Sequence, residues 1–265
     1  MYKALTMTVI LISASGCATN SNKANTSVLD EWIDVDSNAL AQPITEGSRY
    51  SGMRDVAIST GVQAGLYDRS REINRWLKAY HDRFSVIFDF SNLLLPGNIL
   101  PPVVTETDEI KEVADGGRMA RRIQRTYQLE TDPVVVTSPP TYLNYLYREF
   151  QKPETPQRAA LPRPGNPEEQ ELWNQWVREG WAIGVRQANM QFDANANRLQ
   201  RDFVGMQRYL ELADKNVLSL PRTSTEDLGV TRSKDGKTLY IGDVVLKLDV
   251  NPAFTKSEDW LVVPQ

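Results

Sequence analysis

The stretch NPEEQELWNQWVREGWAIGVRQANMQFDANANRLQRDFVGMQRYLEL, residues 166–212, decides the fold. Asn166 offers an N-cap side chain, Pro167 suits the first helical position, and Glu168 and Glu169 face the positive end of the helix dipole. Further along, apolar residues recur at alternating four- and three-residue steps, which keeps them on one seam. They are Phe192, Ala196, Leu199, Phe203, Met206, Leu210 and Ala213. The stretch predicts one long helix from Asn166 to about Leu212, with this seam buried against a partner.

The predicted partner is a second long helix over residues 51–88. Its apolar residues also recur mostly at three- and four-residue steps, and charged residues fill the other side. Gly61 and Gly65 lie four residues apart, on one face; each costs up to about 1 kcal/mol against Ala in a helix interior, so they indicate a close backbone contact. We expect this helix to end before Pro96-Gly97 and to pack antiparallel to, or crossed with, the 166–212 helix.

Shorter elements and a proline-rich connector are predicted between the two helices. Residues 103–105, 121–129 and 134–137 are compatible with β-strands, with helix as the alternative over 118–125. Residues 141–150 predict a short aromatic helix. Prolines 153, 156, 162, 164 and 167 then predict a stiff, extended connector rather than packed structure.

The C-terminal part predicts antiparallel β structure. Residues 239–241 and 244–248 flank Gly242-Asp243, which has the glycine of a two-residue hairpin turn. Asp235-Gly236 marks another turn, after a candidate strand at 228–231. The predicted fold class is therefore α+β: two long packed helices plus a short aromatic helix and small antiparallel β elements.

The N-terminus resembles that of a secreted lipoprotein. Residues 1–16 contain Lys3, no acidic residue, an apolar core and small residues before Cys17, which together describe a signal peptide. At roughly 20 residues needed to cross a bilayer, this stretch is too short to span one. Small residues directly before the only cysteine resemble the lipobox of bacterial lipoproteins, which implies that Cys17 is lipidated with fatty acyl chains such as palmitate. Ala18, rather than Asp, after the acceptor favours the outer membrane by the same resemblance.

The remaining chain predicts a tether and one domain. Residues 18–27 lack any large apolar side chain, so residues 17–50 are interpreted as the lipidated cysteine and a flexible stalk. Residues 51–265 are interpreted as a single α+β domain. The formal net charge is −4, without a basic block, which argues against direct binding of nucleic acid.

The constellations that enzymes need are missing from the sequence. His81 is the only histidine and Cys17 the only cysteine, so metal sites and cysteine nucleophiles lack ligands or bases, and no cofactor motif occurs. Acidic residues of the kind that cleave peptidoglycan do occur, but nothing in the sequence singles one of them out as catalytic. They are Glu168, Glu169, Glu171, Asp193, Asp202 and Asp227. We therefore expect no enzymatic activity and no catalytic, cofactor or metal site; a cell-wall hydrolase is the weakest alternative.

Aromatic residues leave a second alternative open. Tyr142, Tyr145, Tyr147, Phe150, Trp173, Trp176 and Trp181 form two dense groups. Such groups line sugar-binding grooves, although core and interface packing is their commoner role. A peptidoglycan-binding envelope lipoprotein is therefore the alternative function, and core packing is the favoured interpretation.

Six blocks of sequence, in order along nearly the whole mature chain, resemble the DotC family. They are Val62–Leu66, Phe88–Leu93 with Asn98–Val103, Thr137–Thr141, Gln187–Asn189, Asp202–Met206 and Asp227–Thr231. DotC proteins are outer-membrane lipoproteins of type IVB secretion systems, and the conjugative-plasmid relatives, called TraI, are similar to this shorter chain.

The resemblance implies a structural role. It implies a scaffold subunit that assembles with a DotD-like lipoprotein and a DotH-like protein into a ring-shaped hetero-oligomeric core complex, on the periplasmic face of the outer membrane. The family has no catalytic residues to transfer, and only the lipid acceptor corresponds to a residue here, Cys17.

Overall fold

The structure, a computed structural model, describes residues 29, 33, 46–114, 116 and 118–261. The predicted signal peptide, Cys17 and most of the predicted stalk lie outside the described residues. The fold is α+β, as predicted, with long helices and small antiparallel sheets. The elements follow in the order α2 (Glu46–Ala79), α3 (His81–Ile87), β1 (Ile99–Leu100), β2 (Val104–Ala114), β3 (Met119–Leu129), β4 (Val134–Val135), α4 (Tyr142–Leu146), α5 (Pro167–Asp214), β5 (Arg222–Arg232) and β6 (Leu239–Val250).

Helices α2 and α5 form the body of the molecule, and α5 is the long helix that residues 166–212 predict. It has 48 residues, which corresponds to a length of about 72 Å. Asn166 caps its start as predicted, since the side-chain oxygen accepts from the N–H groups of Glu168 and Glu169. Two of its seam residues, Leu199 and Met206, are buried. Most of the remaining contacts of α5 are with α2.

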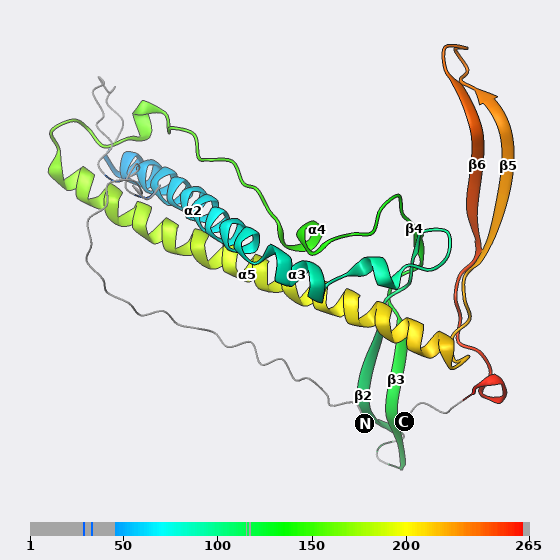
Figure 1. Cartoon of the computed structure of the whole chain (residues 1–265). Helices are drawn as coiled ribbons and strands as arrows, with labels where there is room; N and C mark the ends of the chain where they lie inside the picture. Colours follow the sequence, from blue (N-terminus) through cyan, green and yellow to red (C-terminus); the bar gives the residue numbers. More distant parts are fainter. Residues whose placement is uncertain (1–28, 30–32, 34–45, 115, 117, 262–265) are drawn as a thin grey trace.

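The two helices run parallel, so the antiparallel or crossed packing predicted from the sequence is wrong. Ile58 meets Gly180, Val62 meets Gly184, and Arg69 donates to Asn189, so partner numbers rise together along both helices. Figure 1 shows why: the connector from α4 runs back along the whole helix pair before α5 begins. Because the connector covers the length of α2, α5 starts beside the start of α2 rather than beside its end.

Glycines bring the two backbones into direct contact. A Cβ atom added at Gly61 would lie 2.3 Å from the carbonyl oxygen of Val177, and one at Gly65 would lie 2.4 Å from that of Trp181. On α5, a Cβ at Gly180 would lie 2.2 Å from the carbonyl oxygen of Ile58. The close backbone contact predicted from Gly61 and Gly65 is confirmed, and α5 contributes matching glycines.

Helix α2 begins five residues before the predicted start at residue 51 and ends earlier than predicted. Its first turns are held by Arg49, which is buried and donates to both carboxylate oxygens of Glu169. At its other end the predicted single helix over 51–88 is interrupted at Tyr80 and continues as α3. There Phe84 stacks on Tyr142 with ring centroids 5.2 Å apart, so α3 follows the aromatic core around α4. Helix α3 ends at Ile87, before Pro96-Gly97 as predicted.

The connector after α4 is extended, as predicted, but it packs against the helices. Pro153, Leu161 and Pro162 are buried, and Arg49 donates to the carbonyl oxygens of Ala159 and Leu161. A proline-rich segment has fewer backbone donors to satisfy than other sequences, and Arg49 serves two of its acceptors. The prediction of an unpacked connector is therefore wrong.

The β structure consists of three two-stranded antiparallel sheets, β1–β4, β2–β3 and β5–β6. Strand β3 contains the predicted strand 121–129, so the helical alternative over 118–125 is wrong, and β2 extends well beyond the predicted 103–105. The predicted hairpin turn at Gly242-Asp243 is also wrong, because residues 239–250 form the single strand β6. The predicted turn at Asp235-Gly236 is confirmed and joins β5 to β6.

Candidate interaction surface

The histidine and some of the carboxylates considered from the sequence have structural partners. His81 Nδ1 lies 2.8 Å from the hydroxyl oxygen of Tyr142. Glu169 forms the ion pair with Arg49 at 3.0 Å, and Asp227 accepts from the N–H of Gly229. Within the described residues, no group of three or more His, Cys, Asp or Glu side chains is placed to hold a metal ion.

Glu169 has a structural role, because its carboxylate is both buried and paired. Its side chain is 1 % exposed, and burial by itself raises the pKa of a carboxyl group. Hydrogen bonds from Arg49 and from the N–H of Arg163, with the positive charges of both side chains, outweigh that effect and lower its pKa. Glu169 is therefore charged and structural, which is the interpretation given to it from its place at the helix start.

The aromatic groups lie mainly in the core. Tyr142, Tyr145 and Trp173 are buried, and Tyr145 stacks on Phe90 with ring centroids 5.7 Å apart. Burial raises the pKa of Tyr145 to about 12. These rings are unavailable to a sugar, so core packing is confirmed for them.

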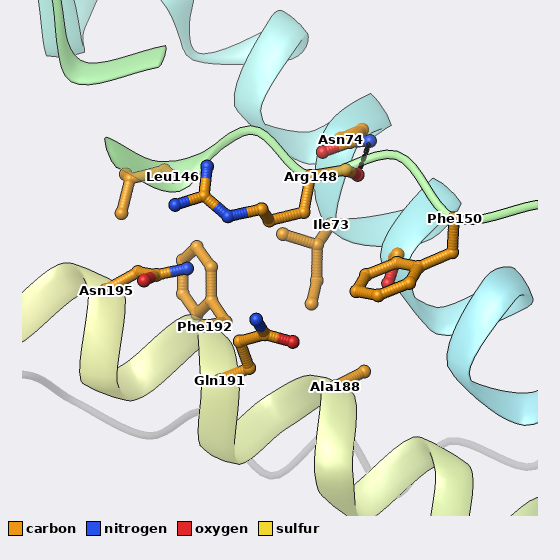
Figure 2. A pocket seen from close by; sticks show the side chains of 10 residues that line it. Ile73, Asn74, Leu146, Arg148, Phe150, Ala188, Gln191, Phe192 and Asn195 are labelled. Atoms are coloured by element: carbon orange, nitrogen blue, oxygen red, sulfur yellow. Dashed lines mark hydrogen bonds between the residues drawn. The ribbon is translucent and has the colours of Figure 1, made fainter. Parts of the chain in front are cut away.

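A small cavity lies between α2, α5 and the start of the connector, and Figure 2 shows the side chains that line it. Its volume of about 10 Å³ has room for about one water molecule. The side chain of Asn74 closes one side by donating to the carbonyl oxygen of Arg148 at 2.6 Å. Asn195 Nδ2, which also lines the cavity, is buried without a hydrogen-bond partner among the described residues, so a water fits this site better than a substrate.

The β5–β6 hairpin offers the clearest candidate for an interaction surface. It extends away from the helix pair (Figure 1), and no other element makes more than marginal contact with it. Large apolar side chains along it are exposed to solvent. They are Leu228, Val230, Leu239, Tyr240, Ile241, Val244 and Val250. A two-stranded hairpin is marginally stable by itself in water, so this surface is suited to packing against a partner.

The apolar side chains are concentrated near the tip because of the register. Val230 pairs directly with Ile241, and Leu239 lies two residues away on the same face. Ile241 is 78 % exposed. Just below this cluster, Leu228 and Gly242 have no cross-strand partner and form bulges, with Gly242 at φ +72°. Bulges bend a hairpin and increase its twist, so they set the direction in which the apolar tip projects.

Reasoning from the sequence missed this surface because it assigned residues 239–248 to a separate hairpin. A signal was present: the run Leu239–Ile241 and Val244–Leu248 is apolar at neighbouring as well as alternating positions. Such a strand has apolar side chains on both faces. The described part of the chain has no layer that covers either face of β5–β6.

A sequence model of the family described as "Type IV secretory system, conjugal DNA-protein transfer" (T4SS_TraI) matches residues 47–262. The chain belongs to this family. The match includes both long helices and every hairpin, so the exposed β5–β6 surface is part of the region that defines a T4SS_TraI protein. A role in a type IV secretory system follows.

A search of curated proteins found no match to this chain. Among the described helices, none is long and apolar enough to cross a bilayer.

Proposed function

We propose that this protein is a structural outer-membrane lipoprotein of a type IVB secretion or conjugation system, related to DotC, and that it has no enzymatic activity. In this proposal Cys17 carries the lipid, and a DotD-like lipoprotein and a DotH-like protein are its partners in a ring-shaped core complex on the periplasmic face. The observation that carries the proposal is the projecting β5–β6 hairpin. Its apolar tip has no covering layer in the described chain.

The physical basis is the apolar surface that folding leaves exposed on the hairpin, because burial of that surface on assembly is favourable. Each Å² of apolar surface removed from water contributes about 25 cal/mol. The body of the molecule has already buried seam residues such as Leu199 and Met206 in its core. By contrast, Val230, Leu239 and Ile241 remain 62–78 % exposed. A subunit that joins neighbours through such a hairpin gains this energy on assembly, which fits a scaffold better than a free-standing protein.

Affinity purification of the tagged protein from membranes of cells that carry the complete system tests the proposal. Mass spectrometry and electron microscopy should recover DotD-like and DotH-like partners in ring-shaped particles. The variant Ile241→Lys should lose these partners. The matched control Val86→Lys changes an equally exposed residue on α3, 80 % against 78 %, and should retain them. Recovery of a monomer from the unchanged chain would refute the proposal.

One groove favours peptidoglycan binding as the second candidate function. Tyr67, Tyr147 and Phe150 line it together with Arg71, Arg75, Lys78 and Arg148, and its volume is about 270 Å³. Aromatic rings stack on sugar rings, and cations pair with the carboxylates of peptide stems. Retention of the purified protein on isolated sacculi, lost in an Arg71→Glu, Arg75→Glu double variant, would support this candidate over a purely structural one.

A further inference from the structure

A long groove runs beside strand β3, and none of the residues that line it comes from β2. One wall is seven consecutive residues of β3, from Arg121 to Tyr127. The other wall is formed by Val217, Phe254 and Trp260, and the groove has a volume of about 840 Å³. Seven residues of strand correspond to a length of about 23 Å. The groove therefore matches an extended segment in shape.

The β3 wall presents the edge of a sheet. Strand β3 pairs only with β2 among the described residues, in register from Val104–Leu129 to Ala114–Met119. In an antiparallel pair, every second residue directs its N–H and C=O away from its partner. These outward groups form a row of donors and acceptors that another strand can continue.

The opposite wall is held firmly in place. A β-bridge joins Leu218 to Phe254, and Thr255 donates through its backbone N–H to the carbonyl oxygen of Val217 at 3.0 Å. The indole N–H of Trp260 donates to Thr255 Oγ1 at 3.0 Å. This wall contributes apolar surface, since Phe254 is 43 % exposed.

The charge of the groove is one-sided. Arg121, Arg122 and Arg125 line it, and none of its lining residues is Asp or Glu. Arg125 already pairs with Glu106 at 2.7 Å across the hairpin. A guanidinium has five N–H donors, so an incoming carboxylate adds to such contacts and does not need to replace them.

We propose that this groove binds an extended segment of a partner protein by strand addition to β3, and that the segment alternates acidic and apolar side chains. Alternation follows from strand geometry, which sends successive side chains to opposite faces. Arg121 and Arg125 lie on one face of β3 and Arg122 on the other. The proposal goes beyond the function proposed above, because it identifies a second contact surface and the chemistry of its occupant.

Single-stranded nucleic acid also has negative charge and an extended shape, but the groove fits it less well. Binding of single strands relies on aromatic faces on which bases stack. Trp260 packs against the core cluster around Val104 and Tyr209. A row of outward backbone N–H and C=O groups, by contrast, is matched by another peptide backbone.

Fluorescence anisotropy with a labelled decapeptide of alternating Glu and Val tests the proposal on the full chain purified in detergent. This peptide should bind, and binding should weaken as salt is added. A Lys/Val decapeptide should bind at least about tenfold more weakly, as should Glu/Val peptides N-methylated at alternate residues in either phase, because they lose strand hydrogen bonds. Equal binding of the Lys/Val peptide or of both methylated peptides, or no binding of the Glu/Val peptide, would overturn the proposal.

Two variants and one further probe make the test specific to the groove. The double variant Arg121→Gln, Arg125→Gln removes both guanidinium groups of one face and should weaken binding of the Glu/Val peptide about tenfold, whereas Lys111→Gln on β2, outside the groove, should leave it within about twofold. Circular dichroism of both variants checks that they remain folded. Tighter binding of a twelve-residue oligothymidine than of the peptide, lost in the double variant, would assign the groove to nucleic acid and overturn the proposal.

Discussion

Substitution of Gly180 by Ala tests the contact on which the helix pair depends. The added Cβ would lie 2.2 Å from the carbonyl oxygen of Ile58, whereas ordinary contacts are 3.4–4 Å. The helices would have to separate by about 1 Å, and this separation would loosen the packing of buried neighbours such as Ala57 and Val177. Overpacking of this kind costs about 1–3 kcal/mol, and occasionally more, of which the better helix propensity of Ala returns up to about 1 kcal/mol. Because backbone rather than a flexible side chain blocks the site, we expect the cost to lie at the upper end of this range, which leaves a net loss of about 2 kcal/mol.

Gly52 provides the matched control. It lies in the same helix pair, on α2, is exposed, and an added Cβ would meet no atom within 4 Å. Gly52→Ala should therefore raise the free energy of unfolding by up to about 1 kcal/mol. Urea unfolding followed by circular dichroism at 222 nm measures both changes. If Gly180→Ala were as stable as the unchanged protein, or more so, the inference that these backbones touch would be wrong.

Four other predictions concern the ion pair, the cap and the anchor. Arg49→Met should lower the free energy of unfolding by about 3–5 kcal/mol, because it leaves the buried carboxylate of Glu169 without its main partner; an unchanged urea midpoint would contradict this. Because the folded-state pKa of Glu169 is lowered, its contribution is fully present above its unfolded pKa and is lost as pH falls through the folded pKa. Stability measured from pH 7 to pH 3 should therefore fall less steeply in Glu169→Gln than in the unchanged protein. Asn166→Ala should cost about 1 kcal/mol through loss of the N-cap, again read from urea unfolding, and a change below a few tenths would argue against the cap. Cys17→Ser should abolish incorporation of labelled palmitate and release the protein from membranes lacking its partners, and persistent labelling would refute the lipid anchor.

Local sequence signals predicted the helices well, because caps and apolar periodicity depend on residues only a few positions apart in the sequence. Asn166 and Pro167 mark the start of α5 to the residue, because capping and the missing N–H of proline act within one turn. Gly61 and Gly65 indicated the close backbone contact, because their cost in a helix interior needs a structural reason. The start of α2 was placed five residues late, because the partner of Arg49 lies 120 residues away in sequence.

The C-terminal hairpin shows where a local signal has two meanings. A glycine with positive φ suits the first position of a tight turn and also suits a bulge, and Gly242 forms the bulge. The choice depends on residues 222–232, which pair with residues 239–250 along their whole length. The candidate interaction surface at the tip, Val230 against Ile241, exists only in that register.

The sequence by itself determined the fold class, the long helices and their buried seam, because periodicity and caps act over a few residues. It also determined which side chains are available for catalysis or metal binding, since His81 is the only histidine in the chain. Only the tertiary structure decided that α2 and α5 run parallel, which strands pair, and which apolar side chains remain exposed. Those features depend on the path of a connector and on contacts between residues far apart in sequence, where local periodicity carries no information about direction or register.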